Sequence, residues 1–187
     1  MGRFAQNYFN SIGRFFIDIT FFVGKMSASG KKWERVVESG MNSLIGEYRN
    51  TLDEKGRILF PAKLRSALTE NSLFITKSLD NCLWLYTPGC WNELQTKLLE
   101  NTSSFSPRNR QLLRRLLAPA QEVEFDKAGR LSIPQILREY AGLTKDCVIV
   151  GVGRNMELWD AEAYRKTVED FEPSIEEAAQ ELSELKF

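Results

Sequence analysis

The 187-residue chain contains no histidine and only three cysteines. Without histidine, the commonest general base is missing and neither a Ser-His nor a Cys-His nucleophile can form. Cys82, Cys90 and Cys147 show no Cys-x-x-Cys spacing, and their odd number leaves one thiol unpaired. Zinc sites and disulfide frameworks are therefore not expected, and a reducing cytosol is the natural compartment. We predict a protein that is not an enzyme and has no cofactor, metal or small-molecule substrate.

The chain also lacks net charge, with 25 basic and 25 acidic residues, but the charge is unevenly distributed. Residues 46–168 hold 18 Lys and Arg against 15 Asp and Glu, whereas residues 169–187 hold seven acids and one lysine. Net charge bears on association rather than on fold. A nucleic-acid contact is consequently expected in the mildly basic body and not in the acidic tail.

Long hydrophobic runs are missing as well. Residues 12–23 are the best candidate, but Arg14 and Asp18 interrupt them, and the run is shorter than the ~20 apolar residues that cross a bilayer. Half of the twelve phenylalanines nevertheless fall within the first 22 residues. A secretory signal fits poorly, because the apolar run is charged and no small-residue cleavage site follows it. We therefore expect no membrane span.

What the chain does contain is a duplication. Residues 48–65 and 122–138 both carry Asp-x-x-Gly-Arg, three residues, Pro, two residues and Leu-Arg. A constant offset of 73 residues relates the copies and extends, without a gap, to Tyr86 over Trp159 and Trp91 over Tyr164. Internal repeats determine architecture, so we predict two equivalent structural units.

Each copy predicts a strand, a tight turn, a second strand and a short helix. Tyr48, Asn50 and Leu52 alternate as in a half-buried strand. In the turn, Asp accepts backbone N–H groups and Gly supplies a positive φ, and the later Pro suits a first helical position. A strand pair and a longer helix, over residues 88–100 or from 160 to about 171, should follow. The residues assigned to structure are Asp53, Gly56, Pro61, Asp126, Gly129 and Pro134.

Two further segments are expected to be helical. In residues 101–120, Ser106 is an N-cap candidate before Pro107, and four leucines form an apolar stripe. Four arginines make this helix basic: Arg108, Arg110, Arg114 and Arg115. Packing is the favoured role for Arg114 and Arg115, while phosphate contact stays open for the other two. Residues 172–187 predict an acidic amphipathic helix opened by a Ser174–Glu177 capping box.

These motifs resemble the MraZ family, bacterial transcription regulators of the division and cell-wall gene cluster. The similarity rests on Gly-Glu-Tyr-Arg-Asn-Thr-Leu-Asp-Glu-Lys-Gly-Arg-Ile-Leu-Phe-Pro, on Leu-Asp-Asn-Cys-Leu-Trp-Leu-Tyr and on Asp-Lys-Ala-Gly-Arg-Leu-Ser-Ile-Pro. It implies a mainly β, α+β fold in which two swapped-hairpin AbrB-like repeats, residues 46–100 and 121–171, form an internal pseudo-dimer. It also implies a cytoplasmic, nucleoid-associated homo-oligomeric ring that binds double-stranded DNA at tandem promoter repeats.

The resemblance also bears on residues 1–40, which have no counterpart in the family. The favoured interpretation is that translation starts at Met41. A disordered N-terminus is the second interpretation and a membrane anchor the third.

The family's DNA-binding arginine corresponds to Arg57, and the repeat gives Arg130 the matching role. Lys55 and Lys127 suit phosphate contact, and Arg49 and Lys63 are further candidates. One alternative is that Asp53 and Asp126 pair with these arginines only to hold each turn together. At the level of function, the alternative to a DNA-binding repressor is a non-enzymatic assembly module of the same fold.

Overall fold

The structure is a computed structural model and describes residues 44–102 and 106–175. All of them belong to the second of the two units into which the chain divides, residues 38–187. The expectations for residues 1–40, and for the tail helix beyond residue 175, lie outside the described residues.

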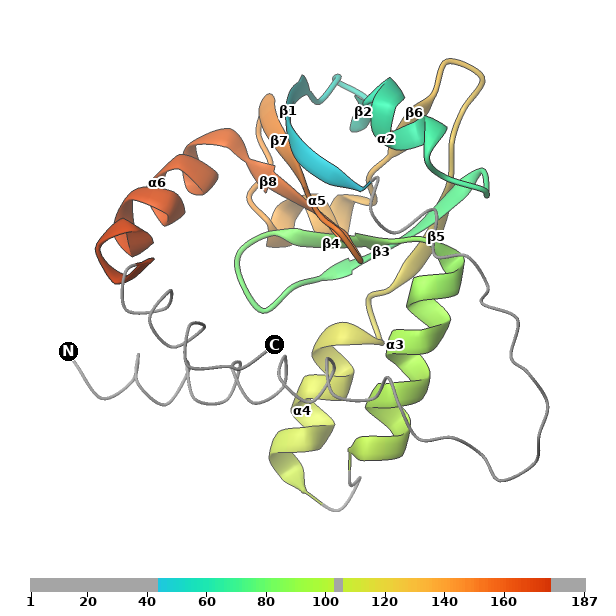
Figure 1. Cartoon of the computed structure of the whole chain (residues 1–187), viewed down its shortest axis with the longest axis vertical. Coiled ribbons are helices and arrows are strands. Elements are labelled where there is room, and N and C mark those ends of the chain that lie inside the picture. The colour runs from blue at the N-terminus through green and yellow to red at the C-terminus, as the bar shows by residue number, and fades with distance from the viewer. Residues whose placement is uncertain (1–43, 103–105, 176–187) are drawn as a thin grey trace, which may run out of the picture. The chain divides into compact units, whose positions relative to one another are not determined.

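The two copies contain the same series of elements (Figure 1). The first copy comprises β1 (Ile45–Thr51), β2 (Arg57–Leu59), α2 (Ala62–Ser66), β3 (Ser72–Lys77), β4 (Leu83–Tyr86) and α3 (Pro88–Asn101). The second comprises β5 (Gln121–Glu124), β6 (Arg130–Ser132), α5 (Gln135–Tyr140), β7 (Asp146–Val152), β8 (Met156–Asp160) and α6 (Ala161–Phe171). Helix α4 (Pro107–Leu116) connects them, and the short 3-10 helix η2 (Glu172–Ser174) follows α6.

The strands form a six-stranded antiparallel sheet in the order β1-β7-β8-β4-β3-β5 and a two-stranded ribbon of β2 and β6. The first strand of each copy pairs with the other copy: β1 with β7, and β5 with β3. Swapping the two copies exchanges β1 with β5, β3 with β7 and β4 with β8. The strand order then reads the same from the opposite edge of the sheet. The predicted internal pseudo-dimer is thereby confirmed.

The two-fold relation holds at the level of single residue pairs. Leu83 faces Leu158 and Leu85 faces Met156 across the β4–β8 pair, so the axis passes between these central strands. The axis also passes between β2 and β6, because the pairs Arg57–Ser132 and Leu59–Arg130 exchange with each other.

The prediction of a gapless offset was wrong at β3 and β7. Asn50 pairs with Cys147, whereas its equivalent Val123 pairs with Leu73, so these strands correspond at an offset of 74. The extra residue lies after α5, where Gly142 has φ +58° and its N–H donates to the Glu139 carbonyl. A helix end of this kind favours glycine. The β7–β8 turn is correspondingly shorter, which restores the offset of 73 in β8.

The core lies between the six-stranded sheet and a layer made of the ribbon with α2 and α5. Ile58 and Leu131 point inward from the ribbon and are completely buried, and the rings of Phe60 and Phe125 pack with centroids 5.2 Å apart. Cys82 and Cys147 are buried free thiols. Both copies contribute to one cluster, so neither copy has a core of its own.

The opposite face of the sheet is covered by helices from both copies. Tyr86 packs on Trp91 of α3 at 6.0 Å, and Trp159 packs on Tyr164 of α6 at 5.9 Å. These pairs occupy equivalent positions. These rings therefore pack one helix from each copy against this face of the sheet.

One detail of the helix starts differs from the predictions. Pro61 and Pro134 occupy the N-cap positions of α2 and α5, one residue before the first helical position. The Ser174 hydroxyl donates to the Phe171 carbonyl, and the predicted capping box with Glu177 extends beyond the described residues. Ser106 does cap α4, since its hydroxyl accepts the Asn109 N–H.

Arg115 of α4 ties the connecting helix to both copies. Its guanidinium donates to the carbonyls of Ser78 and Leu79 and to the Tyr140 hydroxyl. The packing role expected for this arginine agrees with these contacts. In the described part of the chain, no helix is long and apolar enough to span a bilayer.

Candidate nucleic-acid interface

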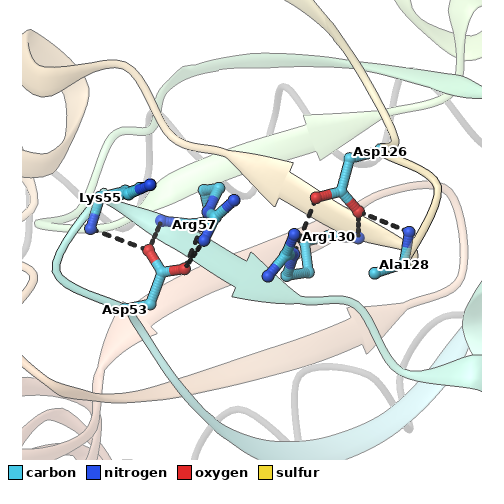
Figure 2. A network of polar contacts seen from close by, with 6 residues as sticks. All are labelled: Asp53, Lys55, Arg57, Asp126, Ala128 and Arg130. Carbon is cyan, nitrogen blue, oxygen red and sulfur yellow. Dashed lines mark hydrogen bonds and ion pairs between the residues drawn. The ribbon is translucent and has the colours of Figure 1, made fainter.

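The first Asp-x-x-Gly-Arg turn is closed by its aspartate (Figure 2). Asp53 Oδ1 accepts the backbone N–H groups of Lys55 at 3.0 Å and Arg57 at 2.9 Å, and Oδ2 accepts Arg57 Nε at 2.8 Å. Gly56 takes φ +73° and donates its N–H to the Asp53 carbonyl. A side chain with a Cβ would be strained at this φ, which explains the glycine.

The second turn repeats this arrangement on the neighbouring strand (Figure 2). Asp126 accepts the N–H groups of Ala128 and Arg130, both at 2.9 Å, and Arg130 Nε at 2.7 Å. The turns are also joined to each other, because Phe60 N–H donates to the Gly129 carbonyl and Ile133 N–H to the Gly56 carbonyl. The two arginines thus project from one continuous hydrogen-bonded unit.

The ion pairs change the acidity of the turn residues. The hydrogen bond from the Arg57 side chain lowers the pKa of Asp53 from 3.8 to about 2. The backbone N–H of Arg130 is the main cause that lowers the pKa of Asp126. The pKa of Arg57 is raised, chiefly by its hydrogen bond to Asp53 and also by the charge of Asp126. Asp53, Asp126 and Arg57 are consequently charged at neutral pH.

The lowered pKa of Asp53 predicts an acid-sensitive contribution to stability. Because the folded-state pKa lies below that of the unfolded chain, the stabilisation is present above pH 3.8 and is lost as the pH falls toward about 2. We expect Asp53→Asn to weaken the dependence of the urea midpoint on pH in this range. Unfolding series at several pH values would test it. Identical pH dependence in the wild type and the variant would contradict the assignment.

The outer side of the ribbon, here called the ribbon face, consists of Arg57, Leu59, Arg130 and Ser132. Side chains alternate along a strand, so these four point away from the buried Ile58 and Leu131. The Arg57 side chain is 29% exposed and the Arg130 side chain 35% exposed. The guanidinium groups are therefore neither sequestered in the core nor free of partners: each is held by its aspartate and is in part open to solvent.

Two arginines that the sequence reasoning did not single out also contact the turns. A Cβ on Gly56 would lie 2.5 Å from Cζ of Arg138, and a Cβ on Gly129 would lie 1.2 Å from Nη1 of Arg65. Each of these arginines thus packs on the turn of the other copy. Their identical place in both motifs, as the Arg of Leu-Arg, was the signal that could have revealed them.

The remaining candidate site residues do not all lie near the ribbon face. Lys55 and Lys127 are exposed beside the turn aspartates, and Lys63 is exposed on α2, which follows the ribbon strand β2. Arg49 is different. It lines a groove with Glu47, Asp160 and Tyr164 beside α6, while its neighbour Tyr48 packs toward the core. Arg49 therefore lies on the other face of the sheet and is not brought together with the ribbon face.

The part of the chain that the structure describes contains no candidate metal site. Among residues 44–102 and 106–175, no group of three or more Cys, Asp and Glu could hold a metal ion. The α6 groove carries charges of both signs, and Arg165 there is paired with Glu162 and Glu169. The ribbon face and its flanking lysines are thus the strongest candidate for binding an anionic partner.

Comparison with known proteins agrees with the duplication. The family model described as MraZ protein matches the chain twice, over residues 44–115 and 116–185. A "Transcriptional regulator MraZ" of Treponema denticola is 51% identical over 144 residues, which cover 77% of this chain and 100% of the relative. Proteins of the same name from two strains of Treponema pallidum are 42% identical over 144 residues, covering 77% of this chain and 97% of each relative.

Proposed function

Because the chain belongs to the MraZ family of transcriptional regulators, we propose that it binds double-stranded DNA sequence-specifically through the ribbon face. We further propose that it acts in the cytoplasm, on the nucleoid, as a repressor of the division and cell-wall gene cluster. A regulator of transcription is not a class of enzyme, and the chain has no histidine with which to build the commonest catalytic groups.

One observation carries this proposal: the ribbon presents two arginines side by side at the pseudo-two-fold axis. Arg57 and Arg130 are diagonal neighbours in the β2–β6 ladder, a spacing of about 7–8 Å in antiparallel strands. The major groove of B-DNA admits a two-stranded β-ribbon, and arginine is the commonest specific partner of guanine there. Lys55 and Lys127 extend the positive charge to both ends of the ribbon and suit phosphate contact.

A single ribbon offers a small contact area, so we propose that several subunits act together as a ring on tandem promoter repeats. Linking several weak sites raises the overall affinity through effective concentration, provided that all of them reach the same duplex. This arrangement would allow a neutral chain with only a local basic surface to bind DNA tightly.

A second candidate function follows from the ion pairs. Since Asp53 and Asp126 hold both arginines, the turns could act only in folding and assembly. The protein would then be an interaction module without DNA contacts. The two functions predict different results for the same DNA-binding experiment.

The test is a titration of the duplex upstream of the gene at increasing salt. The two cations per subunit that are assigned to phosphate contact, Lys55 and Lys127, predict a slope of log K against log salt of about −1.8 for each engaged subunit. Arg154→Gln is the matched control, because it removes one exposed charge at the far end of the β1–β7 ladder. Its slope should equal that of the wild type. An absence of any shift, even at about 50 mM salt, would favour the assembly function.

A further inference from the structure

The ribbon face is symmetric in its arginines but not in its other two residues. Leu59 and Ser132 occupy equivalent positions, and both are exposed. Leu59 lies opposite Arg130, and Ser132 lies opposite Arg57. One half of the surface therefore pairs a guanidinium with an apolar side chain, and the other half pairs it with a hydroxyl.

Leu59 makes no contribution to the core that would explain its size. It is 54% exposed, whereas its neighbours Ile58 and Phe60 are fully buried. A single exposed leucine needs no explanation in general. This one lies at the centre of the surface proposed to contact DNA, with its Cβ about 4.5–5.5 Å from that of the arginine opposite.

The two side chains suit different groups on base edges. In the major groove the thymine methyl is the apolar group, and it is contacted by apolar side chains. A serine hydroxyl can donate or accept, and can therefore bond to several bases. Arginine prefers the two acceptors of guanine. An Arg–Leu pair and an Arg–Ser pair thus favour different short sequences.

Building on the proposed function, we propose that Leu59 and Ser132 determine the sequence specificity of the two halves, with Leu59 contacting a thymine methyl group. A two-fold symmetric backbone would then recognise a non-palindromic sequence, since the side chains on its two halves differ. The residues that flank the ribbon face also differ between its two halves, because Lys55 is equivalent to Ala128 and Glu54 to Lys127.

The experiment uses the full-length protein and duplexes selected by it from a randomised pool. Each thymine of the selected duplex is replaced in turn by uracil, which removes only the methyl group. We expect the wild type to lose about fourfold in affinity at one thymine per bound subunit, the value for one buried methyl-sized group. Leu59→Ser should bind the thymine and uracil duplexes equally well. Leu59→Met keeps the apolar contact and should retain the loss.

Ile136→Ser is the matched control, because Ile136 is 57% exposed on α5 and lies outside the ribbon face. The loss of affinity that each uracil substitution causes should be the same for this variant as for the wild type. Reselection with Leu59→Ser, whose ribbon face has the same residues in both halves, should yield a more palindromic sequence.

Three results would overturn the inference. They are a wild type indifferent to every uracil, a Leu59→Ser variant with an unchanged profile, and a change in the mass of that variant in solution. The third would identify Leu59 as a contact between subunits. Failure of the proposed function looks different, since the wild type would then select no duplex at all.

Discussion

Replacing Arg57 with alanine is expected to reduce DNA affinity by roughly 100-fold at physiological salt, because a good arginine–guanine pair contributes about 1–3 kcal/mol and the loss recurs in every subunit of an assembly. Arg130→Ala should have an effect of similar size, since the two residues are related by the pseudo-two-fold axis. A gel-shift titration on the upstream duplex measures both. Circular dichroism and the mass in solution should stay unchanged.

Asp53→Asn separates DNA contact from a purely structural role. Asparagine still accepts the backbone N–H groups of Lys55 and Arg57, but it no longer neutralises the guanidinium. If Arg57 contacts DNA, this variant should bind at least as tightly as the wild type and with less discrimination between sequences. If Arg57 only holds the turn, the Asp53→Asn and Arg57→Ala variants should lose stability to a similar extent. Arg165→Ala, which breaks two ion pairs on α6, is the control for losing a paired arginine.

Separating the two copies should abolish folding of each as a monomer. A polypeptide of residues 44–102 loses the β7 partner of β1, the β5 partner of β3, the β6 partner of β2 and the β8 partner of β4. Since one cluster of side chains from both copies forms the core, the loss should exceed the ~5–15 kcal/mol that stabilises a typical domain. Circular dichroism of each half at low concentration measures this.

Mixing the halves provides the complementary result. Residues 44–102 and 106–175 should combine one to one and regain strand structure, because all four exchanged pairings form again. Light scattering should give the mass of the complex. A half that stays monomeric and unfolds cooperatively by itself would contradict the swapped arrangement.

Much of this architecture could be predicted from the repeat. The positions of Asp53, Gly56 and their equivalents define a turn by local chemistry alone, and the alternation before each turn defines a strand. These features depend on neighbours within about five residues.

The parts that were not predicted depend on contacts between distant residues. Nothing near Arg49 shows that it faces α6 instead of the ribbon, because alternation defines two faces and does not say which elements cover them. Arg65 and Arg138 cross to the opposite copy, a contact that local spacing cannot reveal. The extra residue at Gly142 was missed because the offset between the copies is 73 both in the ribbon strands and in β8. The insertion after α5 and the shorter β7–β8 turn cancel, so the sequence on either side shows no gap.

The covalent connection through α3 and α4 has a consequence for behaviour on dilution. A two-chain dimer dissociates as its concentration falls, and its folded state then disappears with it. Here the partner halves belong to one polypeptide, so each encounters the other at a fixed local concentration however scarce the protein is. The ribbon with its two arginines should stay assembled when a cell holds only a few copies.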